Sequence, residues 1–247
     1  MSGASNTATV TATTAAIGTA TTTASAAAAQ PQAARSSAGR RIVFDFVGVL
    51  FQWQPRDLLR RLLPEQASDD ASAMHWERQI FQGYDGDWAE FDRGLVEPDA
   101  LAARIAHRTG LAAAVVRTVI DAVPLTLQPV AATVNLLERL RAAGPALYYL
   151  SNMPASYADH LERHNPFLAG FADGVISARV QLSKPDPLIF ELAARRFGVA
   201  PADLVFLDDV AANVAAARAA GWQALLFVNA AQAEAELRAA GWWPQAS

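Results

Sequence analysis

Six polar side chains follow apolar, strand-like segments of the 247-residue chain and could act together in catalysis. In chain order they are Asp45, Ser151, Asn152, Lys184, Asp208 and Asp209. Three carboxylates that meet at one place repel one another unless a cation lies among them, and ligands that are all oxygen favour Mg²⁺ over zinc or copper. An ammonium and a hydroxyl beside the ion suit a phosphoryl group, which a carboxylate can accept covalently. These residue types therefore predict phosphoryl transfer through an aspartyl phosphate.

Strand-like and helical segments alternate along the second half of the chain. We expect strands in the apolar run that begins at Arg41 and over 146–150, 174–177, 204–207 and 224–228. We expect helices over 130–143, 155–164, 187–197, 211–220 and 231–240. Strands that are apolar throughout are typical of a parallel sheet with helices on both faces, where ligands bind at the carboxyl ends of the strands. The sequence therefore predicts an α/β, Rossmann-like fold.

The organisation of the chain predicts one core with an insertion. Residues 54–127 carry helical patterns and no convincing strand, so we expect a helical cap inserted into a core made of residues 40–53 and 128–247. Residues 1–39 consist mostly of Ala, Thr, Ser and Gly, with no acidic residue. Such a segment buries too little surface to offset its ordering entropy, so we expect a disordered extension.

The composition excludes several classes of protein. With 52% hydrophobic and 18% charged residues the chain can bury a sizeable core, and its net charge of −4 argues against nucleic-acid and membrane partners. The chain has no cysteine, which rules out disulfides and thiolate metal sites. No run reaches the roughly 18 apolar residues of a membrane span. We expect a cytoplasmic monomer or homodimer that acts on a small phosphorylated metabolite.

Four short motifs, in the same order, carry a resemblance to a known family. They are FDFVGVL at 44–50, LSN at 150–152, SKPDP at 183–187 and FLDD at 206–209. Together they resemble the motifs of the haloacid dehalogenase-like (HAD) hydrolase superfamily. The resemblance covers roughly residues 41–228 and implies a Rossmann-like core with a helical cap inserted after the first strand.

The resemblance also implies roles for single residues. Asp45 would be the nucleophile, and Ser151 and Lys184 would take part in catalysis. Substrate binding would involve Ser151, Asn152, Lys184 and Gly48. Lys184 is the only lysine among 20 basic residues, as expected where a compact ammonium is needed and a planar guanidinium would not fit.

The implied metal ligands are Asp45, the backbone carbonyl of Val47, Asp208 and Asp209, with Mg²⁺ as the cofactor. Val47 departs from the family pattern, because most phosphatases of the superfamily have a second aspartate there, which protonates the leaving oxygen. Loss of a general acid typically lowers the rate by about 10²–10⁴-fold. We therefore expect slow turnover, a substrate with a good leaving group, or a substitute acid from the cap or the substrate.

Two other functions remain open at this point. In a 2-haloacid dehalogenase, Asp45 would displace halide from carbon without a metal, although that branch usually has residues of the Ser-Asn type where this chain has Asp208 and Asp209. Alternatively, Val47 could mark a catalytically weak protein that binds a phosphorylated ligand.

An acidic and aromatic stretch at residues 85–92 is expected to form a turn of the cap near the mouth of the active site. Trp88 and Phe91 would then contact substrate or pack inside the cap. Trp53, at the entrance to the cap, would line the site or hold the hinge.

Overall fold

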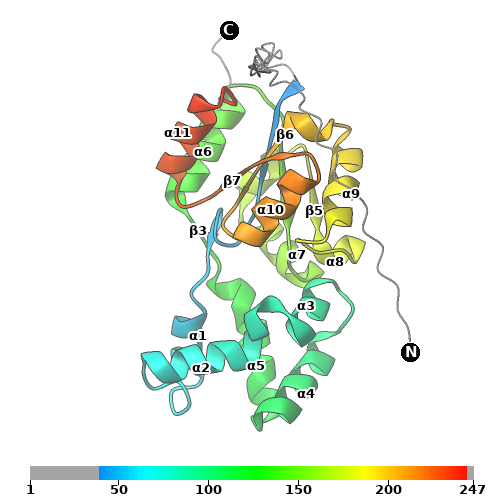
Figure 1. The fold of residues 1–247 in the computed structure, drawn as a ribbon. Helices are drawn as coiled ribbons and strands as arrows, with labels where there is room; N and C mark the ends of the chain where they lie inside the picture. Colours follow the sequence, from blue (N-terminus) through cyan, green and yellow to red (C-terminus); the bar gives the residue numbers. More distant parts are fainter. Residues whose placement is uncertain (1–38, 244–247) are drawn as a thin grey trace, which may run out of the picture. The chain divides into compact units, whose positions relative to one another are not determined.

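A five-stranded parallel sheet forms the core of the part of the chain that the computed structural model describes, residues 39–243 (Figure 1). Its strands are β1 (Arg41–Phe44), β4 (Leu147–Ser151), β5 (Asp173–Ile176), β6 (Leu204–Asp208) and β7 (Gln223–Leu226). They lie in the order β5-β4-β1-β6-β7. Apart from Gly39, the extension expected at residues 1–39 lies outside the described residues.

Helices cover both faces of this sheet, because successive strand residues point to opposite faces. Ile42 and Phe44 pack with α6 (Ala131–Ala142), α7 (Ala155–His164) and α11 (Ala230–Ala239), whereas Val43 packs with α9 (Pro187–Phe197) and α10 (Ala211–Ala219). The short elements α8 (Ser177–Val180), η3 (Pro166–Gly170) and η4 (Pro201–Asp203) complete the connections. The predicted α/β, Rossmann-like fold is confirmed.

The strand order brings the predicted site residues together. β1 pairs with β4 on one side and with β6 on the other, all three running parallel. The chain leaves β1 for β4 and β5 and then crosses to β6, which makes the carboxyl end of β1 a topological switch point. Asp45, Ser151 and Asp208, at the ends of these strands, therefore share one edge of the sheet.

Helices fill the segment between β2 (Phe51–Gln52) and β3 (Gln128–Pro129), two short antiparallel strands that hold its ends together. They are α1 (Pro55–Leu62), α2 (Asp70–Phe81), η2 (Gln82–Tyr84), α3 (Gly86–Asp92), α4 (Pro98–Thr109) and α5 (Ala113–Thr126). Their ends follow local chemistry, since a capping box starts α2 and α4 has proline at its start and a left-handed glycine after its end. Within residues 39–243, no helix is long and apolar enough to cross a membrane.

The prediction of a turn at residues 85–92 is wrong, because α3 occupies most of this stretch. Asp85 is the N-cap residue of α3, yet its side chain makes no capping hydrogen bond. The Oε1 atom of Gln82, a residue with φ of 51°, instead accepts a hydrogen bond from the backbone N–H of Asp87 at 3.0 Å. A glutamine that lies five residues before the N–H it accepts from, and whose backbone is left-handed, is not a usual signal for the start of a helix. The sequence pattern therefore did not indicate this helix.

Candidate active site

Asp45 lies directly after the central strand and is buried. Its backbone N–H donates to the carbonyl of Leu207 at 3.0 Å, which continues the pairing of β1 with β6. Its Oδ1 atom accepts a hydrogen bond from the backbone N–H of Phe46 at 2.7 Å. The sheet and the following turn thus fix both the backbone and the carboxylate of the predicted nucleophile.

Lys184 joins two of the predicted acids. Its Nζ lies 2.8 Å from Oδ1 of Asp45 and 2.8 Å from Oδ2 of Asp208, and donates to the carbonyl of Leu150 at 3.0 Å. The amide of Asn152 holds the Lys184 backbone, since Nδ2 donates to its carbonyl at 2.8 Å and Oδ1 accepts from its N–H at 2.9 Å. Because only 4% of the surface of Lys184 is exposed, its closely packed surroundings favour a compact ammonium over the wider guanidinium of arginine.

The carboxylates of Asp45, Asp208 and Asp209 form the only cluster of possible metal ligands found among the described residues, with ligand oxygens within 4.8 Å of one another. Asp208 is fully buried. It accepts hydrogen bonds from the backbone N–H of Val210 at 2.8 Å and from Nδ2 of Asn213 at 3.1 Å. Neighbouring groups therefore fix one face of the acid cluster.

The charges of this cluster fit a divalent cation. Burial raises the pKa of Asp45 to about 7, with Asp208 and Asp209 adding to the shift and Lys184 opposing it. Burial and the charge of Asp208 also raise the pKa of Asp209. Burial acts to lower the pKa of Lys184, but Asp45 and Asp208 outweigh it and raise that pKa. One ammonium faces three carboxylates, and all-oxygen ligands of this kind suit Mg²⁺.

Gly48 does not lie where its expected role in substrate binding would place it. It does not line the cavity beside the acids, whereas Val47 does. A Cβ on Gly48 would lie 2.1 Å from Oδ2 of Asp209, and the φ of Gly48 is +86°. Glycine is therefore required here so that the Asp209 carboxylate can approach the loop after β1. Substrate binding by Gly48 stays a prediction.

Ser151 ends β4, and its hydroxyl is a buried polar atom without a partner. Its side chain is almost completely buried, and Oγ has no hydrogen-bond partner in the structure. Buried polar atoms are nearly always hydrogen-bonded, so such an orphan calls for an explanation. Ser151 does not itself line the cavity that contains Asp45 and Asn152. Its role as the phosphate-binding hydroxyl stays a prediction.

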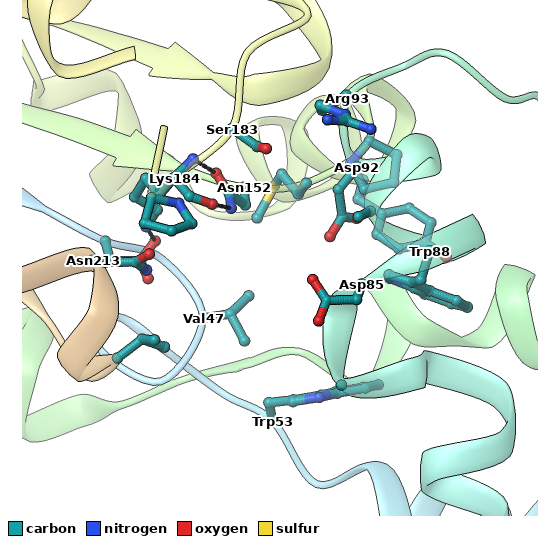
Figure 2. A pocket seen from close by; sticks show the side chains of 18 of the residues that line it. Val47, Trp53, Asp85, Trp88, Asp92, Arg93, Asn152, Ser183, Lys184 and Asn213 are labelled. Carbon is teal, nitrogen blue, oxygen red and sulfur yellow. Dashed lines mark hydrogen bonds and ion pairs between the residues drawn. The ribbon is translucent and has the colours of Figure 1, made fainter. Parts of the chain in front are cut away.

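A cavity of about 400 Å³ opens beside the acids, lined by both core and cap (Figure 2). Its core wall includes Asp45, Asn152, Lys184, Asp209 and Asn213. Its apolar wall includes Trp53, Trp88, Val123, Leu127, Met153 and Tyr157. Phe91 lies outside this lining and packs edge-on against Trp88 and Tyr157. Of the two roles open to each of these aromatic residues, Trp53 and Trp88 line the cavity and Phe91 packs.

Asp85, Asp92 and Arg93 also line this cavity but were not predicted as site residues. Figure 2 shows the carboxyl groups of Asp85 and Asp92 pointing into the cavity from the side opposite Lys184 and Asn213. Both acids belong to the stretch noted at residues 85–92. The sequence could not separate them from the other acids there, because only the course of α3 decides which side chains point inward.

Comparison with known proteins assigns the chain to a family. Residues 40–221 match the family described as haloacid dehalogenase-like hydrolase. The chain belongs to the HAD-like hydrolases. It is 28% identical over 199 residues to the sesquiterpene phosphatase astK of Aspergillus oryzae, a match that covers 79% of this chain and 93% of that protein. The resemblance inferred from the motifs is confirmed, and the HAD-like chain is a hydrolase.

Solved structures of other HAD proteins share the fold. The HAD family enzyme bt-2542 from Bacteroides thetaiotaomicron, solved as a magnesium complex, matches with a TM-score of 0.63 at 21% identity, covering 81% of this chain and 98% of that one. The L-2-haloacid dehalogenase from Xanthobacter autotrophicus matches with a TM-score of 0.58 at 19% identity, covering 75% and 76%. These similarities show the fold alone, and a shared fold does not by itself determine the reaction.

Proposed function

We propose that this HAD-like hydrolase is a Mg²⁺-dependent phosphatase that acts on small phosphate monoesters through an aspartyl phosphate on Asp45. The observation that carries the proposal is the cluster of Asp45, Asp208 and Asp209, whose oxygens lie within 4.8 Å of one another beside the buried ammonium of Lys184. Asp208 and Asp209, with Asp45 and the backbone carbonyl of Val47, would hold the metal.

In the proposed reaction, a carboxylate oxygen of Asp45 attacks phosphorus and the bond from phosphorus to the ester oxygen breaks. Lys184 favours the ionised form of Asp45 and orients it, and the hydroxyl of Ser151 donates to a non-bridging oxygen. A bound Mg²⁺ would neutralise charge on the phosphoryl oxygens. Water then attacks the aspartyl phosphate, which releases phosphate and restores the carboxylate.

The walls of the cavity support an ester with a largely apolar organic group. Trp53, Trp88, Val123 and Leu127 offer hydrocarbon and aromatic surface next to the polar end that Asp45 marks. Binding becomes more favourable when apolar area of a ligand is buried against such a surface. The similarity to a sesquiterpene phosphatase supports the same class. In this proposal residues 54–127 act as a cap that closes the site against water.

Halide displacement by Asp45 is the less favoured reaction. A dehalogenase needs no metal, yet the exposed Asp209 lies near the buried Asp208 and has a raised pKa, and a bound cation would offset the repulsion between the two carboxylates. Release of halide from 2-haloacids in the presence of a chelator would contradict the phosphatase proposal.

The test is phosphate release from p-nitrophenyl phosphate, glycerol phosphate and a prenyl monophosphate, with Mg²⁺ and with EDTA. We expect hydrolysis that requires Mg²⁺ and favours the prenyl ester. Asp45→Asn removes the nucleophile at constant shape and should lower the rate by at least ~10⁴-fold. Asp87→Asn, an exchange of the same type outside the cavity lining, is the matched control and should leave the rate unchanged.

A further inference from the structure

Asp92, the last residue of α3, is a buried carboxyl group without a partner. Only 8% of its surface is exposed, its side chain has no hydrogen bond or ion pair in the structure, and it lines the same cavity as Asp45. Figure 2 shows its carboxyl group pointing into that cavity. A buried carboxyl that lacks a protein partner costs free energy unless a ligand satisfies it.

The backbone of Asp92 is held by the core. Ser177, the first residue of α8, donates from Oγ to the carbonyl of Asp92 and accepts from the backbone N–H of Met153 at 2.9 Å. Met153 follows Ser151 and Asn152 by only one or two residues, so one buried hydroxyl connects Asp92 to the loop that carries the phosphate-site side chains.

The chain after Asp92 also lies against the core. Gly94 has a φ of +69°, and a Cβ there would lie 2.9 Å from the carbonyl oxygen of Ala178. Only a glycine allows this approach of the cap to α8. The two contacts, at residues 92 and 94, fix the end of α3 relative to the phosphate site.

The reaction lacks a proton donor on the core side. Val47, two residues after Asp45, has no ionisable group, so an alkoxide leaving oxygen would depart without a proton. The cavity-lining ionisable groups of the core are Asp45 and Asp209, which the metal site requires, Lys184, which pairs with Asp45 and Asp208, and Tyr157, whose hydroxyl donates to the carbonyl of Ile120 at 2.6 Å.

We propose that Asp92 is the catalytic acid and base of this hydrolase and replaces from the cap the carboxyl group that Val47 lacks. The proposal rests on the proposed phosphatase function. When the bond from phosphorus to the ester oxygen breaks, the Asp92 carboxyl gives its proton to that oxygen, which leaves as an alcohol. Asp92 is then a carboxylate, and it takes a proton from the water that attacks the aspartyl phosphate. Each cycle returns Asp92 to its protonated form.

The environment of Asp92 favours the proton-bearing form. Burial raises the pKa of Asp92 to about 8. The groups that share its end of the cavity are Asp85, Arg93 and the hydroxyl of Tyr157, and none of them pairs with its carboxyl. Asp85 is exposed to solvent and does not share this burial. Of the two cap carboxyls in the cavity, Asp92 is therefore the one suited to donate a proton at neutral pH.

The experiment compares two esters in Asp92→Asn, Asp85→Asn and Asp87→Asn. The leaving group of p-nitrophenyl phosphate departs as a stable anion, whereas that of an alkyl phosphate requires a proton. We expect Asp92→Asn to lower kcat/KM, which reports formation of the aspartyl phosphate, by about 10²–10⁴-fold for the alkyl ester and by less than about 5-fold for the aryl ester. The rate of the wild-type chain on the alkyl ester should fall above about pH 8, and that limb should be absent in Asp92→Asn.

Other outcomes overturn the assignment. Equal losses of kcat/KM on both esters, or a rise in KM with kcat unchanged, would make Asp92 a structural or binding residue. A selective loss in Asp85→Asn, with Asp92→Asn unaffected, would move the role to Asp85. Circular dichroism and the melting temperature show whether each variant is folded. If the wild-type chain hydrolyses neither ester, the phosphatase function itself fails, and the Asp92 assignment fails with it.

Discussion

The acidic residues on the two sides of the cavity differ in whether the protein supplies partners for their carboxyl groups. On the core side, the carboxylates of Asp45, which lines the cavity, and of Asp208, which is buried outside its lining, accept hydrogen bonds from backbone N–H groups, and both pair with Lys184. On the cap wall, the side chain of Asp85 makes no capping hydrogen bond at the start of α3, where Gln82 accepts one instead. The Asp92 carboxyl is buried without a partner. The core thus fixes its charges through the protein, whereas the cap leaves its carboxyl groups for a ligand.

This difference separates two tasks. A site that binds a metal and a phosphoryl group must hold several like charges together, which requires compensation by fixed neighbours. A group that transfers a proton must be able to lose and regain it, so a permanent ion-pair partner would hinder it. Substitutions on the core wall and then on the cap wall test this division.

The largest effect is expected from Lys184→Met. The exchange leaves Asp45 and Asp208 buried without a counter-charge, which destabilises a protein by about 3–5 kcal/mol. Hydrolysis of both esters should fall together, by at least ~10³-fold. Urea unfolding and initial rates measure the two effects. A folded variant that keeps its rate would show that the core wall does not depend on this ammonium.

A smaller effect is expected from Gly48→Ala. The new Cβ would lie 2.1 Å from Oδ2 of Asp209, so this carboxylate must move. We expect the Mg²⁺ concentration for half-maximal rate to rise about 10–100-fold, the range for a disturbed metal site. Gly110→Ala is the matched control, because Gly110 also has positive φ (+77°) but has nothing within 4 Å of a new Cβ. An equal shift in both variants would attribute the effect to backbone strain.

Ser151→Ala should separate activity from stability. Removal of a buried hydroxyl that has no protein partner should leave the free energy of unfolding within about 1 kcal/mol of the wild type. Loss of a hydrogen bond to a charged phosphoryl oxygen should lower kcat/KM by about 10–100-fold. Thr133→Val is the control, because Oγ1 of Thr133 is also buried without a partner but lies in α6 and not at the carboxyl end of a strand. A rate equal to that of the wild type in Ser151→Ala would remove the serine from the phosphate site.

The last prediction concerns the cap wall and is a pH dependence of stability. The pKa of Asp92 rises from 3.8 in a free side chain to about 8 in the fold. Between about pH 4 and pH 8 the folded chain therefore binds the proton that the unfolded chain has lost, so stability falls as pH rises, by at most ~1.4 kcal/mol per pH unit from this group. Asp92→Asn removes this loss.

Thermal melts of the wild-type chain and Asp92→Asn from pH 5 to pH 8 measure the effect. The variant should become progressively more stable relative to the wild type as pH rises. A difference that is constant over this range would mean that Asp92 does not hold its proton in the fold, and would weaken the contrast between the two walls.

The amino-acid sequence by itself determined the core of this protein. Strand segments that are apolar throughout are buried in a parallel sheet, and the polar residues that follow them gather where the strands end. The proximity of Asp45, Lys184, Asp208 and Asp209 was therefore predictable from the order of these segments. The match to the HAD-like hydrolases confirms the family that these motifs indicated.

Only the tertiary structure decided the cap wall and the finer roles on the core wall. Helical periodicity predicts that residues 54–127 form helices, but it does not determine which acid of the 85–92 stretch points inward. That choice depends on the hydrogen bond from Ser177 and on the close approach of Gly94 to α8, contacts between residues some 85 positions apart. In the same way, the steric need for Gly48 arises from Asp209, which is distant in sequence and adjacent only in the folded chain.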